Sequence, residues 1–190
     1  MKATLSLIES LIREELIQKQ LDKIDQLEAA GGKIQMVVDN SSIQLIYTKN
    51  SRNIEGALVA VKEKKNCLNS FSVSFVSATK GFGPLLYEVA IEFLSRYGIP
   101  LTSDRVSVSD DARKVWSTFQ KRADVEAHQL DDLIGTLTPD NVSDDCKQAS
   151  AVKDGNWQDS PQSKTYKKNQ KDRPLLKRLI SKDMLEYSRQ

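Results

Sequence analysis

The sequence has few of the side chains that build metal centres and disulfide frameworks. Among 190 residues there are one histidine, His128, and two cysteines, Cys67 and Cys146, which stand far apart and without metal-ligand spacing. This argues against a zinc site, and two reduced thiols are a simpler interpretation than a disulfide. We therefore expect no metal cofactor.

Long apolar runs are also missing. No stretch approaches the roughly 20 apolar residues that a membrane-spanning helix needs. Charged residues between Glu9 and Glu15 interrupt the apolar run that a signal peptide would require. We expect a cytoplasmic protein that does not associate with membranes.

Charge is unevenly distributed. Residues 163–190 hold nine Lys or Arg against three Asp or Glu, whereas the rest of the chain holds 19 against 23. A basic tail can bind nucleic acid, so we consider binding through residues 164–182, with Tyr166 available to stack on a base. A tail that is simply solvated is the alternative interpretation.

Length and composition predict one α/β domain with appendages. A chain of this length can bury one core of ordinary size but not two. We expect an N-terminal helix packed on the core at 1–32, an α/β core at 33–138, and an irregular extension with a basic C-terminal helix at 139–190. The predicted sheet is mixed and mostly antiparallel, with helices flanking it.

The N-terminal segment has helical periodicity. Apolar residues recur three or four apart from Ser6 to Ala30, Ser6 and Glu9 fit a capping box, and Gly31-Gly32 fits a helix end. This apolar stripe could pack on the chain's own sheet or pair with a second copy in a coiled coil.

Strand patterns follow, and then the periodicity changes back to helical. Three short β-branched runs predict an antiparallel meander, and Phe71–Val76 alternates as a half-buried strand. A glycine turn at Gly81-Phe82-Gly83 then leads into a helix that Gly98 ends. The three runs are Ile34–Val38, Ile43–Tyr47 and Ala57–Val61.

The remaining pattern is weaker. Pro100–Val106 predicts a short strand, Ser109 predicts the cap of the next helix, and Leu133–Leu137 could form a last strand. Residues 138–171 are polar and without periodicity, so we expect them to be mostly irregular. From Pro174 to Tyr187 the spacing predicts a short amphipathic helix.

The glycine turn is the candidate cofactor site. The start of a helix offers unpaired N–H groups and the positive end of the helix dipole, which together attract phosphate. Without a third glycine or a Gly-Lys-Ser/Thr ending, the turn is neither a dinucleotide fingerprint nor a P-loop. Glycine turns that serve geometry alone are common. The candidate binding residues are Lys80, Gly81, Phe82, Gly83, Leu85 and Leu86.

With this turn, the order of elements over about residues 34–137 resembles the GNAT-type N-acetyltransferase superfamily, whose central strand splits from its neighbour to admit the pantetheine arm of acetyl-CoA. The segments Lys80–Tyr87, Leu101–Arg105, Ser107–Ser109 and Ala112–Trp116 resemble GNAT-like proteins of tailed bacteriophages. The resemblance implies an acyl-CoA ligand, transfer of its acyl group to an amine, and a location in the host cytoplasm or the virion.

The sequence departs from the family pattern at three places. Ala78 stands where a Gln or Arg usually opens the pyrophosphate loop, Trp116 stands at the position of the usual acid tyrosine, and a single N-terminal helix replaces the family's first strand and two helices. Of the available groups, Asp104 is the candidate base and Ser103 a candidate proton relay. Asp104 could instead form an ion pair or a turn contact.

These observations predict an acyltransferase and leave two alternatives. The fold could serve a catalytically inactive virion or host-interaction protein that binds a protein partner, or a phage assembly, through its terminal helices. The basic tail could instead bind nucleic acid.

Overall fold

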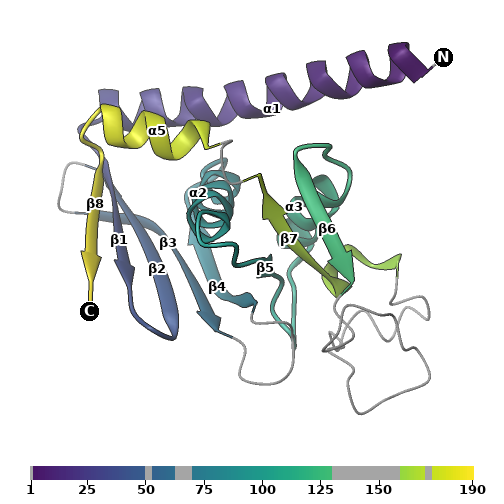
Figure 1. Ribbon diagram of the computed structural model, residues 1–190. Helices are drawn as coiled ribbons and strands as arrows, with labels where there is room; N and C mark the ends of the chain where they lie inside the picture. Colours follow the sequence, from purple (N-terminus) through teal and green to yellow (C-terminus); the bar gives the residue numbers. More distant parts are fainter. Residues whose placement is uncertain (1, 50–52, 63–69, 130–158, 170–172) are drawn as a thin grey trace.

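A computed structural model describes residues 2–49, 53–62, 70–129, 159–169 and 173–190. Within them, one eight-stranded mixed sheet has the order β6-β7-β5-β4-β3-β2-β1-β8 (Figure 1). Only β4–β5 and β1–β8 pair in parallel, which confirms the predicted mostly antiparallel α/β fold. The strands are β1 Lys33–Val38, β2 Ser42–Lys49, β3 Asn53–Lys62, β4 Phe71–Ala78, β5 Leu101–Thr102, β6 Val125–Gln129, β7 Lys164–Lys168 and β8 Leu185–Arg189.

Helices pack against this sheet and against one another. Helices α1 and α5 lie side by side at one end of the sheet, and α2 contacts both of them (Figure 1). The aromatic ring of Trp116 in α3 stacks on Tyr166 of β7 with 5.4 Å between ring centroids, which joins α3 to the core. The helices are α1 Lys2–Ala29, α2 Gly83–Ser95, α3 Asp110–Gln120 and α5 Pro174–Ser181, with a 3₁₀ turn, η2, at Pro161–Ser163.

Helix α1 is longer than its caps suggested. It begins at Lys2, so the prediction that Ser6 caps it is wrong. Its end matches the prediction: Gly31 has a φ of 68°, and the N–H groups of Gly31 and Gly32 donate to the last carbonyls of the helix. In its second half the apolar stripe is buried, whereas Leu11 is 56% exposed.

The central strand–turn–helix unit forms as the sequence predicts. Strands β1 to β4 pair antiparallel with their neighbours, and α2 follows the glycine turn. Strand β4 pairs with β5 only through Phe71 and Ser72, so the two strands part beyond Ser72. On its other side, the register of β4 against β3 shifts at Ser74, which is left unpaired, as in a β-bulge.

The prediction that 139–190 is an irregular extension is wrong for two segments. Residues 164–168 form β7, which lies between β5 and β6, second from one edge of the sheet. Leu185 and Tyr187 belong not to a helix but to β8, which pairs in parallel with β1. Strand β7 was missed because its three lysines resemble a polar tail, whereas Leu185 and Tyr187 of β8 continue the apolar spacing of the preceding helix.

Other expectations from the sequence are corrected by the structure or lie outside the residues that it describes. The predicted strand Pro100–Val106 is reduced to the two residues of β5, and β6 was not predicted. Leu133–Leu137, Cys67 and Cys146 lie outside the described residues. No helix in the described ranges is both long and apolar enough to cross a bilayer.

Candidate functional site

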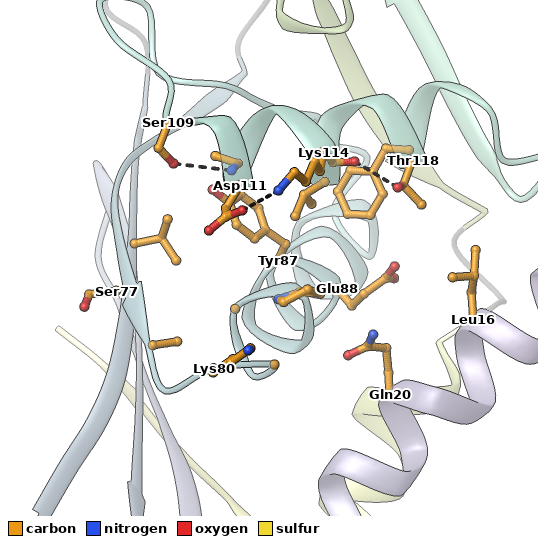
Figure 2. A pocket seen from close by; sticks show the side chains of 18 of the residues that line it. Leu16, Gln20, Ser77, Lys80, Tyr87, Glu88, Ser109, Asp111, Lys114 and Thr118 are labelled. Carbon is orange, nitrogen blue, oxygen red and sulfur yellow. Dashed lines mark hydrogen bonds and ion pairs between the residues drawn. The ribbon is translucent and has the colours of Figure 1, made fainter.

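A cavity of about 730 Å³ lies at the start of α2, and we call it the turn pocket (Figure 2). The end of β4 and the glycine turn form one side, α3 forms the opposite side, and Leu16 and Gln20 of α1 close a third. Its size is that of cavities that hold cofactor-sized ligands. The lining includes Lys80, Gly81, Gly83, Tyr87, Glu88, Lys114 and Arg122.

The two glycines of the turn differ in what they contribute to its backbone. Gly81 has a φ of 88°, a left-handed conformation that side chains disfavour. A Cβ atom added to Gly83 would meet no atom within 4 Å, because it would project into open space. Gly83 is therefore dispensable for the fold, and its missing side chain leaves room at the pocket.

Several N–H groups of the turn remain available. The N–H of Phe82 donates to the Thr79 carbonyl and that of Leu86 donates to the Phe82 carbonyl. Within the described part of the chain, the N–H groups of Gly81, Gly83 and Leu85 have no backbone acceptor. Together with the helix dipole they form a site that suits an anion.

The predicted binding residues divide into two groups. Lys80, Gly81 and Gly83 line the turn pocket. The ring of Phe82 instead stacks on Tyr47 with 5.1 Å between centroids. Leu85 and Leu86 are buried in the core, so only their backbone could contribute to binding.

Lys23 is a candidate that the sequence did not reveal. Its Nζ lies 5.0 Å from the centroid of the Phe82 ring and 3.5 Å from where a Cβ of Gly81 would be. It also donates a hydrogen bond of 3.0 Å to Gln26 Oε1. Helix α1 thus places a cation beside the glycine turn, although Ala78 replaces the basic residue expected there.

A second, smaller hollow of about 210 Å³ lies where β4 parts from β5, and we call it the strand-gap hollow. It shares four lining residues with the turn pocket, so the two cavities adjoin. Its lining comprises Val73, Ser74, Phe75, Val76, Tyr87, Asp104, Ser107, Val108, Ser109, Ala112 and Trp116.

The two predicted catalytic residues lie in different surroundings. Asp104 lines the strand-gap hollow, and its Oδ1 accepts hydrogen bonds of 2.7 Å from the N–H groups of Val106 and Ser107. Ser103 is fully buried, and its hydroxyl donates to the Gln162 carbonyl at 3.1 Å. The structure therefore brings Asp104 to a cavity and does not bring Ser103 to it.

Tyr87 lies where the two cavities meet. Its side chain reaches from α2 toward the first turn of α3, which Ser109 caps by accepting a hydrogen bond from the Ala112 N–H (Figure 2). Burial raises the pKa of the Tyr87 phenol above its usual value of 10.0, so the group stays protonated at neutral pH and can donate a hydrogen bond as well as accept one. Trp116, which stands at the position of the family's acid, is buried against Tyr87 and Tyr166.

Charged residues on α3 form an exposed pair at the pocket wall. Lys114 Nζ lies 2.8 Å from Asp111 Oδ1 (Figure 2). The hydrogen bond from Lys114 lowers the pKa of Asp111, and the same contact raises the pKa of Lys114. Because both side chains are exposed, this pair contributes little to stability.

A buried ionic cluster lies at the far end of the turn pocket. Glu88 contacts Arg122 through Oε1, and its Oε2 lies 2.7 Å from Lys168 Nζ. Glu92 accepts hydrogen bonds from Lys168 and from the N–H of Leu176. Burial raises the pKa of Glu92 even though Lys168 opposes this shift. The cluster comprises Glu88, Glu92, Arg122, Asp124 and Lys168.

The basic tail uses several of its charges inside the fold. Lys168 is buried in the ionic cluster, and Tyr166 is fully buried, so it is not available to stack on a base. Arg178 forms a two-oxygen ion pair with Asp25, and Lys182 pairs with Glu28. The idea of a continuous nucleic-acid surface over 164–182 is therefore wrong at these positions.

Comparisons with known proteins add no identification. No protein-family model matches the sequence, and no curated protein matches it at a significant level. Over the described ranges, no group of three or more His, Cys, Asp or Glu side chains is arranged to hold a metal ion. The functional argument therefore depends on the two cavities and their residues.

Proposed function

We propose that the protein is a GNAT-fold acyltransferase that binds acetyl-CoA or a related acyl-CoA and transfers the acyl group to an amine. The observation that carries this proposal is that β4 parts from β5 beyond Ser72, on the strand that leads into a glycine turn and then a helix. This is the arrangement that the sequence resemblance implies for a bound pantetheine arm.

The turn pocket supplies suitable contacts for the phosphates. Gly81 and Gly83 line the pocket, and their N–H groups have no backbone acceptor among the described residues. Lys80 in the lining and Lys23 beside the turn add positive charge. Contacts to a pyrophosphate at this turn would direct the thioester end of the ligand toward the gap between the strands. The adjoining strand-gap hollow is then the place for the reacting groups.

Acyl transfer at this place has clear requirements. The ammonium group of the acceptor must first lose one proton to a base to become a neutral amine, and Asp104 is the carboxylate among the residues that line the strand-gap hollow. The nitrogen then forms a bond to the thioester carbonyl carbon as the carbon–sulfur bond breaks. A second proton leaves the nitrogen and ends on the departing sulfur. The N–H groups along the edge of β4 and the Tyr87 hydroxyl can donate hydrogen bonds that stabilise the negative charge developing during the reaction.

The decisive experiment is calorimetric titration of the full chain with acetyl-CoA, comparing wild type with Gly83→Leu. The leucine side chain enters open space, so we expect unchanged thermal stability but at least a tenfold loss of affinity. Lys177→Leu, an exposed change on α5 away from the pocket, is the matched control and should bind normally.

Two outcomes would refute the proposal. A folded Gly83→Leu protein with wild-type affinity would remove the glycine turn from the binding site. No binding by folded wild type would remove acyl-CoA altogether and favour the non-catalytic alternative, for which the exposed Leu11 and Ile12 of α1 are the first contact candidates.

A further inference from the structure

The strand-gap hollow contains one fixed negative charge. Among the described residues that line it, only Asp104 has a charged side chain. Two backbone N–H groups hold its Oδ1 in place, so the carboxylate is oriented before any ligand arrives. The other polar side chains of the lining are Ser107, Ser109, Tyr87, Trp116 and Ser74, whose hydroxyl donates to the Val59 carbonyl. A carboxylate with hydroxyls around it suits an ammonium group, which donates in three directions.

The size of the hollow limits what can enter. Its 210 Å³ correspond to about seven water molecules at roughly 30 Å³ each. This is room for an aminoalkyl end, but not for a whole nucleotide. The rest of any amine ligand must therefore lie at the rim.

Two large apolar side chains are exposed in the segments that form the hollow. Phe75 lines the hollow from β4 and is 52% exposed, and Val106, which is 73% exposed, stands in sequence between the lining residues Asp104 and Ser107. Large apolar side chains exposed beside a small polar cavity favour a ligand with an apolar body, because binding removes their surface from water. A second cationic group on the ligand would meet no carboxylate among these lining residues.

We propose that the strand-gap hollow binds a primary amine carried on an apolar alkyl or arylalkyl body, and that this is the class of acyl acceptor. The ammonium group lies at Asp104 and the body lies against Phe75 and Val106. The role as acceptor rests on the proposed acyltransferase function, whereas the binding of the amine does not. Polyamines are disfavoured because the lining offers a single carboxylate.

The experiment is a titration of the ¹⁵N-labelled full chain, followed by NMR, with four probes: phenethylamine, its neutral analogue 2-phenylethanol, ethylamine and spermidine. Phenethylamine should shift the amide signals of 73–76 and 104–109 and bind about tenfold or more tightly than 2-phenylethanol. Asp104→Asn, which keeps an oxygen for the two N–H groups, should abolish that advantage. Val106→Ser should weaken phenethylamine binding but leave ethylamine binding unchanged.

Other results would overturn the inference. Spermidine that binds as tightly as phenethylamine, shifts confined to other amides, or an Asp104→Asn protein with full preference for the amine would each do so. Acetyl-CoA titration separates the two proposals. Phenethylamine binding without acetyl-CoA binding keeps the amine site and refutes the acyl-donor site, and the reverse result refutes the amine site alone.

Discussion

Replacing Lys168 by methionine should destabilise the protein strongly. The cluster around Lys168 holds three carboxylates and two cations among the described residues, so it already has one excess negative charge. Lys168 is 1% exposed and Glu92 is fully buried, so water cannot compensate for the lost ammonium group. Breaking a buried ion pair by removing one partner costs about 3–5 kcal/mol.

That loss is large relative to the total stability. The free energy of unfolding of a native protein is about 5–15 kcal/mol. The neighbouring Lys167→Met provides a matched control, because Lys167 is partly exposed and lies 3.4 Å from the exposed Glu126. An exposed pair contributes at most about 1 kcal/mol, so the two adjacent lysines should differ by at least about 2 kcal/mol.

Urea denaturation followed by circular dichroism gives the free energies of unfolding. The double variant with Glu92→Gln removes one of the carboxylates left unpaired and should recover about 1–3 kcal/mol of the loss. If Lys168→Met and Lys167→Met have the same free energy of unfolding, with the same denaturant slope as wild type, the buried cluster does not exist as described.

Two further predictions concern pH and phosphate contacts. Hydrogen bonds from the Ser42 and Ser41 hydroxyls and N–H groups lower the pKa of Asp39 from 3.8 to about 2, so its contribution is present above pH 3.8 and lost as pH falls toward 2. The difference in melting temperature between wild type and Asp39→Ala should therefore shrink from pH 5 to pH 2, and a constant difference would contradict this. Lys23→Ala should weaken acetyl-CoA binding severalfold but leave the affinity for pantetheine, which lacks the phosphates, unchanged. Lys23→Arg should keep most of the affinity for acetyl-CoA. An equal loss of affinity for both ligands in Lys23→Ala would rule out a phosphate contact.

The elements that the sequence predicts well are those with local signals. The meander has alternating β-branched residues, the helix after the glycine turn has apolar periodicity, and Ser109 caps α3 through its own side chain. These signals act over a few residues, because side-chain spacing and caps set the local backbone. The strand–turn–helix layout and three of the six predicted binding residues followed from them.

The end of α5 shows why other elements were missed. Asp183 adopts a φ of 53°, and the N–H groups of Asp183 and Met184 donate to the Ile180 and Leu179 carbonyls. In this hydrogen-bond pattern the residue with positive φ is normally a glycine. Because Asp183 stands there instead, the sequence contains no signal for the end of the helix. Leu185 and Tyr187 then continued the apparent helical stripe, although they form an edge strand.

By itself the sequence determined the central α/β unit and the glycine turn, because these depend on neighbours along the chain. Tertiary structure alone decided that Lys168 is buried among carboxylates, that Lys23 stands beside the glycine turn, and that two adjoining cavities form. Each of these depends on groups far apart in sequence, and their energies arise only when packing brings them together and excludes water.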